Sequence, residues 1–392
     1  MKNKKLSRDD YLILLANIFS SLASFSFFPY ISTDLAAWIS LTSAQASSAA
    51  GIGVMGGSIL AYFFSTFFSA RNLRKKIVSA FFIGLPSILS IIIINKTALI
   101  PLVLFSLSLI IFRFSISYSS NLIKTLQLKD IKAKKDRSCM LGYIKVTTSV
   151  GGALGPILGS FLFNQYNVIA LLFFSAILFF LSALLILLLT SKTHGVEPAR
   201  VKGESLFRMP RDVFFLCLIA LIHFVFEAQI YAFMAISVEK NNHEAAFLPL
   251  MFSVNAILLI TLTIPVLNVI RRWRVNSVTA ILFGSFLSLI SIITSPYCHS
   301  SISILVITLL FTLGEIITPQ IILQKISQSD NHHEILKFLS TYNLMTFGVG
   351  LTFGYFLSSW AVSLQKPLYS SLAFICVYAF LFILLCIKRK TA

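Results

Sequence analysis

Three ionisable side chains lie well inside long apolar stretches of the sequence. Glu227 and Glu315 are the acidic ones, and Arg113 is the basic one. A charge at the bilayer centre costs at least about 2.5 to 3.5 kcal/mol on insertion scales, so such residues usually mark a functional pathway. A carboxyl group is cheaper to bury protonated than ionised. We therefore expect Glu315, with Glu227 as second candidate, to bind and release a proton.

Two alternatives accompany this hypothesis. Glu315 could instead form a purely structural ion pair with Arg113. His223 lies one helical turn before Glu227, so the two share a helix face. An imidazole there can relay a proton, or it can be a buried histidine hydrogen-bonded to a neighbour.

Other chemistry finds no support in the residue pattern. The His332-His333-Glu334 run matches no known ligand spacing for a metal. Five scattered cysteines form neither a disulfide framework nor a zinc pattern. An enzyme needs a nucleophile with its base, a metal set or a cofactor motif. We expect no enzyme activity, no metal and no cofactor.

The elements that position these residues are predicted to be membrane-spanning helices. The sequence is 57% hydrophobic with a mean hydropathy of +0.88, and only 12% of its residues are charged, against about 25% in soluble domains. Apolar runs of 18 or more residues predict transmembrane helices. The expected fold is an all-α polytopic membrane protein with twelve spans: 11–31, 46–70, 77–94, 99–118, 143–163, 168–190, 212–236, 246–270, 276–294, 301–323, 336–358 and 368–387.

The distribution of Lys and Arg predicts the orientation. With a cytoplasmic N-terminus, the connections on that side carry 28 basic residues, and the opposite side carries three, Lys96, Lys240 and Lys366. This contrast follows the positive-inside rule and places both termini in the cytoplasm. The net charge of +18 therefore reflects membrane topology, and we expect no nucleic-acid partner. The Ala44-Gln45-Ala46 triplet resembles a signal-peptidase site, but cleavage would put every later basic loop on the wrong side.

The longest polar connection divides the chain. We expect an N-terminal six-helix half at 1–190, a cytoplasmic linker at 191–211 and a C-terminal six-helix half at 212–392. A basic cluster follows the second span of each half, at Arg71–Lys76 and at Arg271–Arg274. Two six-span halves are typical of secondary transporters built from internal repeats.

The fifth span contains three glycines spaced four residues apart, Gly151, Gly155 and Gly159, with Pro156 beside them. The glycines form one bare helix face that a neighbouring helix can approach closely, and the proline bends the helix. This segment resembles the antiporter motif G-x-x-x-G-P-x-x-G of drug/proton antiporters in the major facilitator superfamily. A generic small-residue packing stripe is the alternative.

Three further segments resemble motifs of that superfamily. The loop after the second span matches G-x-x-x-D-R-x-G-R-[RK] at Arg71, Arg74 and Lys75, but Thr66, Ala70 and Leu73 replace the two glycines and the acid. Arg113 matches the first residue of R-x-x-Q-G, and Gly314 to Pro319 follow a G-E-x-x-x-P pattern of several drug exporters. A positive-inside anchor explains the loop residues equally well.

The resemblance implies where the ionisable residues lie. Spans one, four, seven and ten line the central cavity in this superfamily, so Arg113, Glu227 and Glu315 would face one water-accessible chamber. Substrate would bind there beside polar and aromatic side chains; the candidates are Asn17, Phe25, Tyr118, Asn255 and Gln320. Hydrogen bonding between helices is the alternative role for the polar ones.

These features favour a secondary transporter that works by alternating access. The leading hypothesis is proton-coupled export of a small amphiphilic or lipophilic molecule, such as a drug, a self-made metabolite or a siderophore, across a bacterial cytoplasmic (inner) membrane. An importer of a nutrient or metal chelate is the alternative within the superfamily, and a non-transporting membrane sensor or enzyme is a third possibility. The expected partners are protons, the small-molecule substrate and the lipid bilayer, and we expect a monomer.

Overall fold

The computed structural model describes residues 7–31, 34–67, 72–97, 101–128, 134–190, 210–231, 233–234, 247–273, 275–326, 332–363 and 372–383. Within these ranges every regular element is a helix. Among the described residues, ten helices are long and apolar enough to cross a membrane. Two further segments, residues 332–363 and the shorter apolar helix Leu372–Ile383, complete the expected twelve.

The chain divides into two compact units. Unit 1 comprises Met1–Val213 and Ile326–Leu344, and unit 2 comprises Phe214–Lys325 and Met345–Ala392. The first boundary falls just after the linker expected at 191–211, of which only residues 210 and 211 are among those described. The eleventh span is shared: its first part belongs to unit 1 and its second part to unit 2.

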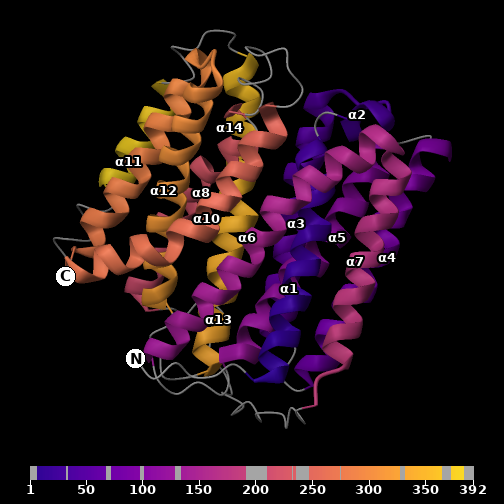
Figure 1. The fold of residues 1–392 in the computed structure, drawn as a ribbon, viewed down its shortest axis with the longest axis horizontal. Helices are drawn as coiled ribbons and strands as arrows, with labels where there is room; N and C mark the ends of the chain where they lie inside the picture. Colours follow the sequence, from indigo (N-terminus) through magenta and orange to yellow (C-terminus); the bar gives the residue numbers. More distant parts are fainter. Residues whose placement is uncertain are drawn as a thin grey trace. The chain divides into compact units, whose positions relative to one another are not determined.

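Unit 1 contains the first six spans. They are α1 (Arg8–Phe27, continued by the 3-10 turn η1, Phe28–Tyr30), α3 (Ser43–Phe67), α4 (Leu73–Thr97), α5 (Pro101–Leu128), α6 (Lys134–Gln165) and α7 (Val168–Leu187). α1 packs against α6 and α7, while α4 and α5 pack together and α3 lies against α5 (Figure 1). A short helix that the hydropathy pattern does not predict, α2 (Asp34–Trp38), precedes α3.

Unit 2 contains the later spans. They are α8 (Arg211–Glu227, continued by η2, Ala228–Tyr231), α10 (Phe247–Arg272), α11 (Ser277–Thr294, followed by η3, Ser295–Tyr297), α12 (Ser301–Ile326), α14 (Leu351–Ser363) and the helix Leu372–Ile383. Their common core includes Phe226, Met251, Ile292, Phe311 and Phe374, one from each of five helices.

The eleventh span differs from the single α-helix that the sequence predicts. It starts as α13 (His332–Asn343), widens into the π-helix η4 (Leu344–Gly350) and continues as α14. α13 packs on α3 and α5 within unit 1, and the Asn343 amide donates a hydrogen bond to Asn121 of α5. The change of helix type therefore coincides with the boundary between the units.

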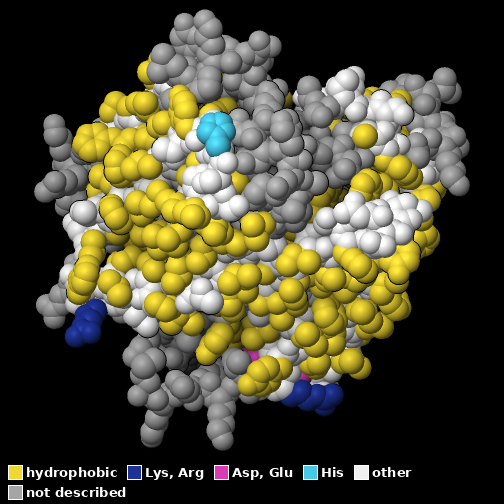
Figure 2. Space-filling view, turned by 45° about the horizontal axis from the view of Figure 1, so that its top comes forward, with side chains coloured by type: hydrophobic (Ala, Val, Ile, Leu, Met, Phe, Trp, Pro, Cys, Tyr) yellow, Lys and Arg dark blue, Asp and Glu magenta, His cyan; other side chains and the backbone are white. Residues whose placement is uncertain are grey.

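Local sequence features account for the ends of several helices. Ser7 caps α1, and a reciprocal bond from the Ser7 backbone N–H to Asp10 closes a capping box. Asn167 and Asn276 cap α7 and α11 through their side-chain oxygens. Apolar side chains cover most of the described surface on the face drawn in Figure 2, as lipid contact requires.

Candidate functional site

Glu315 is buried in the interior of unit 2. Its side chain is 6% exposed, and the Nδ2 of Asn255 on α10 donates to its Oε2 over 3.2 Å. Thr312, one turn earlier on α12, lies 2.5 Å from the Oδ1 of the same amide. Glu315, Asn255 and Thr312 therefore form one continuous chain of hydrogen bonds between α10 and α12.

Gly314 explains how α12 can bring this carboxylate into position. A methyl group on Gly314 would collide with Ser288 and with the carbonyl oxygen of Gly284, both on α11. The missing side chain lets α12 approach the α11 backbone closely. Glu315, the next residue along α12, then reaches Asn255 on α10.

The Thr312 hydroxyl also has a second acceptor. Its Oγ1 lies 2.6 Å from the carbonyl oxygen of Thr308, one turn earlier in α12. A hydroxyl group carries one donor hydrogen and two acceptor lone pairs. Thr312 can therefore donate to Asn255, or donate to Thr308 and accept from Asn255.

His223 and Glu227 lie on α8, a turn apart. His223 is 1% exposed, and its Nδ1 lies 3.3 Å from the Ser285 hydroxyl of α11. Glu227 is the last residue of α8 and is partly buried where the helix changes into η2. The hydrogen bond to Ser285 matches the alternative of a buried histidine satisfied by a neighbour, and a relay role for His223 stays a prediction.

Arg113 and Tyr118 lie on α5 in unit 1. Arg113 is partly buried beside α3, where a methyl group on Gly57 would lie 2.7 Å from its Cβ. Tyr118 is buried and stacks on Phe114 with ring centroids 5.5 Å apart and an angle of 11° between the rings. Phe64 of α3 contacts both rings edge-on, so aromatic side chains gather along this part of α5.

The remaining cavity candidates differ in their surroundings. The Asn17 amide donates to Thr147 over 2.8 Å and to Thr148 over 3.0 Å, so it joins α1 to α6. Gln320 is buried on α12, five residues beyond Glu315. Phe25 is partly buried on α1. The placement of Asn17 matches the interhelical alternative, and a cavity role for these three residues stays a prediction.

The glycines of the fifth span lie against α1. A methyl group on Gly151 would be 2.5 Å from Ser21 Cβ, and one on Gly155 would be 2.7 Å from Phe25 Cβ. One on Gly159 would collide with the carbonyl oxygen of Ser26. The carbonyl of Pro156 accepts a hydrogen bond from the Tyr30 hydroxyl over 2.7 Å. We call this contact between α1 and α6 the glycine seam; an antiporter role for it stays a prediction.

The basic loop after α3 is anchored within unit 1. The guanidinium of Arg74 donates to the carbonyl of Leu187, the last residue of α7, where a cation also complements the helix dipole. Lys75 is exposed, and Arg71 lies outside the described residues. Asn72 has a φ of 60°, a left-handed conformation that Asn tolerates better than most residues.

Several partners of the predicted residues were not identified from the sequence. These partners are hydroxyl residues in apolar helices: Thr312, Ser285, Thr147 and Thr148. Only Thr312 could have been found from the sequence, because it lies three residues before Glu315 and so shares its helix face. Among the described residues, no cluster of three or more His, Cys, Asp or Glu side chains could hold a metal ion. The side chains of His332, His333 and Glu334 lie outside that set.

Comparison with known proteins gives a family and a fold. The sequence model described as Major Facilitator Superfamily matches residues 12–354. No curated protein sequence matches the chain. Among solved structures, a bacterial homologue of the iron transporter ferroportin in the outward-facing state aligns with a TM-score of 0.74 at 12% identity, covering 98% of this chain and 100% of that chain.

Two further solved structures share the fold. The POT family transporter PepTSo aligns with a TM-score of 0.72 at 12% identity over 99% of this chain and 98% of its own. The human organic anion transporter MFSD10 (TETRAN) aligns with a TM-score of 0.68 at 12% identity over 97% of this chain and 100% of its own. All three are transporters, and at these identities the likeness shows the fold.

Proposed function

The chain belongs to the Major Facilitator Superfamily and is a multi-pass membrane transporter, and we propose that it couples proton entry to the export of a small amphiphilic or lipophilic molecule. The cargo is a drug, a self-made metabolite or a siderophore, and the protein acts as a monomer in a bacterial cytoplasmic membrane. Glu315 is the proposed proton carrier. The observation that carries the proposal is the hydrogen-bond chain from Glu315 through Asn255 to Thr312 and Thr308.

This chain can satisfy both protonation states of Glu315. When the carboxylate is ionised, it accepts from the Asn255 N–H, and the Asn255 oxygen accepts from the Thr312 hydroxyl. When Glu315 is protonated, its O–H donates to the Asn255 oxygen after a half-turn of that amide. The Asn255 N–H then donates to Thr312, whose hydroxyl donates to the Thr308 carbonyl. Amide orientation follows from such a network, because nitrogen and oxygen occupy equivalent positions.

The free-energy consequence favours a carrier over a structural residue. Leaving a buried polar group without a hydrogen bond costs about 1–3 kcal/mol. Because the same partners serve both states, Glu315 avoids that cost when it gains or loses a proton. A carboxylate that only stabilises the helix bundle does not need a partner that can switch from donating a hydrogen bond to accepting one.

The aromatic side chains near Arg113 support an amphiphilic cargo. Phe64, Phe114 and Tyr118 offer apolar faces on α3 and α5 within unit 1, the same helix α5 that carries Arg113, and sites for lipophilic ligands are lined mainly by such side chains. Solved structures with this fold include an organic anion transporter, a bacterial homologue of an iron transporter and a POT family peptide transporter. The fold therefore accepts varied cargo, and the lining side chains must select it.

Transport into everted membrane vesicles tests the proposal. We expect a panel of lipophilic dyes to contain at least one that accumulates when the vesicle interior is acidic, and a protonophore to abolish the accumulation. Glu315→Gln, a neutral isostere, should reduce the pH-driven component at least about tenfold, corresponding to 1.4 kcal/mol. Asp212→Asn, at the exposed start of α8, is the matched control.

Two results would contradict the proposal. Full pH-driven accumulation by a well-expressed Glu315→Gln variant would exclude Glu315 as the carrier and favour its structural pairing with Arg113. Accumulation in right-side-out vesicles, with none in everted ones, would make the protein an importer of a nutrient or metal chelate.

A further inference from the structure

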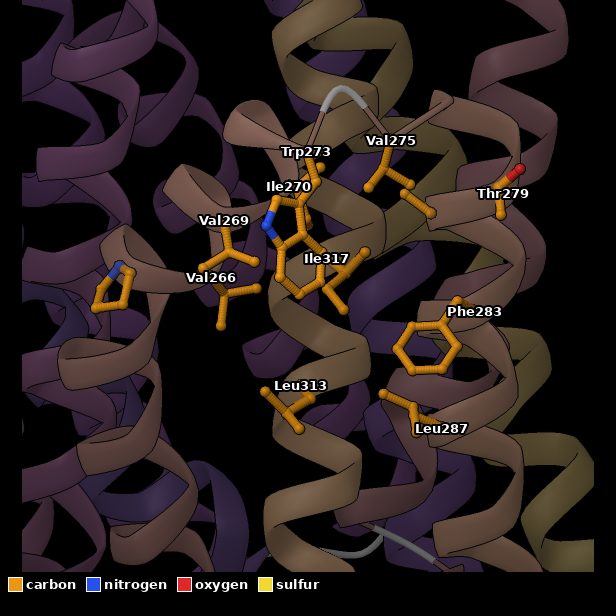
Figure 3. A pocket seen from close by; sticks show the side chains of 12 residues that line it. Val266, Val269, Ile270, Trp273, Val275, Thr279, Phe283, Leu287, Leu313 and Ile317 are labelled. Carbon is orange, nitrogen blue, oxygen red and sulfur yellow. The ribbon is translucent and has the colours of Figure 1, made fainter.

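An apolar groove lies on unit 2 between the end of α10, the start of α11 and the middle of α12. Its volume is about 520 Å³, within the range of sites that hold small molecules. Figure 3 shows Val266 and Val269 of α10 on one side, Phe283 and Leu287 of α11 on the other, and Leu313 and Ile317 of α12 between them. The groove opens to the surface, since Val269 is 45% exposed and Phe283 56% exposed.

The lining restricts what the groove can hold. Among the lining residues that the structure describes, Thr279 is the one with a hydroxyl group, and the others have hydrocarbon or aromatic side chains. A peptide or sugar would lose its hydrogen bonds to water there without replacement, at a cost of several kcal/mol. A hydrocarbon chain makes no hydrogen bonds to water, so it does not incur this cost. The buried part of the ligand is therefore apolar.

The end of the groove provides a complementary charge. Trp273 lies over this end in Figure 3 and is 74% exposed, and its neighbour Arg272 is exposed at the last residue of α10. The connection from α10 to α11 reads Arg271-Arg272-Trp273-Arg274-Val275-Asn276, with three basic residues and no acid. Tryptophan at a helix end is typical of the membrane–water interface, and basic residues there attract anionic lipids.

We propose that this groove is a binding site for an anionic phospholipid. One acyl chain lies between α10, α11 and α12, and the phosphate lies at Arg272 beside Trp273. The apolar lining and the basic end occur together at one interface, which matches a ligand with a hydrocarbon tail and a negative head. The proposal is independent of the transport mechanism, because it uses neither Glu315 nor its partners.

Tryptophan fluorescence tests the site directly. Trp38→Phe and Trp360→Phe leave Trp273 as the single tryptophan of the full chain, reconstituted in zwitterionic nanodiscs. A small fraction of phosphatidylglycerol with brominated acyl chains is added, or the same fraction of brominated phosphatidylcholine. Bromine quenches tryptophan on contact. We expect phosphatidylglycerol to quench Trp273 at about fivefold lower mole fraction, since one basic residue contributes about 1 kcal/mol toward anionic lipid.

Two substitutions separate head-group binding from chain binding. Arg272→Gln should remove most of the preference for phosphatidylglycerol, whereas Arg211→Gln, an equal loss of charge at the exposed start of α8, should keep it. Val269→Phe fills the groove and should weaken quenching by both lipids, whereas Ile264→Phe, on the same helix at 51% exposure and outside the groove, should not. Leu313→Phe replaces Val269→Phe if that variant does not fold.

Three outcomes would overturn the proposal. Equal quenching by the two lipids would remove the anionic preference. Unchanged quenching in Val269→Phe and Leu313→Phe would mean that Trp273 reports bulk lipid and not the groove. Protection of Trp273 from both lipids, together with a dimeric mass in native mass spectrometry, would assign the groove to a second copy of the chain.

Discussion

Asn255 is the residue on which the proposed proton exchange at Glu315 depends. Its amide links the Glu315 carboxyl to the Thr312 hydroxyl, which in turn lies against the Thr308 carbonyl of α12. An amide can exchange donor and acceptor by a half-turn, whereas an ionised carboxylate can only accept. The two states described above therefore need no movement of the backbone.

Thr312 gives the sharpest test of this exchange. Thr312→Val keeps the shape of the side chain and removes the hydroxyl, so the protonated state loses the acceptor for the Asn255 N–H. We expect pH-driven transport in everted vesicles to fall about three- to tenfold, from a bond of about 0.6 to 1.4 kcal/mol in a membrane interior. Thr312→Ser should restore it.

Thr308→Val is the matched control for that substitution. Thr308 is buried one turn earlier on α12, and its hydroxyl donates to the Ile304 carbonyl of its own helix. Its removal leaves the Thr308 carbonyl, the acceptor that matters, in place. Equal losses of transport in the Thr308 and Thr312 variants would refute the exchange and point to a general packing defect.

The sequence indicated which polar residues matter but not which of them contact each other. Glu315 and Asn255 were recognisable because each is polar within an apolar run. The hydrogen bond between them could not be predicted, because 60 residues separate them. Helical periodicity shows which face of a helix a residue lies on, but not which other helix that face contacts. For the same reason, the contact between His223 and Ser285, 62 residues apart, could not be predicted. The hydrogen bonds from Asn17 to Thr147 and Thr148 could not be predicted either.

The glycine seam is the clearest feature at the scale of elements. Because the glycines recur every four residues, they follow one face of α6, and the structure gives that face to α1. On α1, Ser21 meets the seam with its Cβ and Ser26 with its backbone carbonyl, so the α1 backbone lies close to the glycines. Association of helices in lipid relies on such close packing.

Gly159→Ala should weaken the contact between α1 and α6. The added methyl group collides with the Ser26 carbonyl, which belongs to the backbone and cannot move aside alone. Overpacking of this kind costs about 1–3 kcal/mol, visible as a lower midpoint of thermal unfolding in detergent. Gly142→Ala on the same helix adds a methyl group that meets no atom of another described element within 4 Å, and it should not destabilise the protein. A Gly159→Ala variant as stable as Gly142→Ala would disprove the close approach.

The eleventh span shows what hydropathy cannot predict. Residues 336–358 were expected as one helix, and the segment is helical throughout, but η4 interrupts it. A π-turn changes the hydrogen-bond register by one residue and leaves the composition unchanged. In unit 2, Gly350 and Gly354 then let the span pack on α8 and η2: a methyl group on Gly350 would be 2.6 Å from the Leu221 carbonyl.

For the whole molecule, the length of the apolar runs and the distribution of Lys and Arg predicted most of the fold. Long apolar runs predicted the twelve spans, because hydrocarbon forces the backbone into helices. The helices extend beyond those runs where polar residues continue them, as in α5, which reaches Leu128 instead of residue 118, and α6, which starts at Lys134 instead of residue 143. These extensions carry basic residues such as Lys124 and Lys134, which belong on the side predicted to be cytoplasmic.

Reporter fusions test the predicted orientation of the molecule in the membrane. Because 28 basic residues lie on one side and three on the other, a reporter that fluoresces only in the cytoplasm should be bright when fused after Ala392. It should be dark when fused after Lys366, in the connection before the last helix. A periplasm-active phosphatase should give the reverse pattern. We expect this pattern because basic connections stay on the cytoplasmic side of the membrane. A bright fusion at both positions would mean that residues 372–383 do not cross the bilayer, and the last span would then have to be reassigned to the membrane surface.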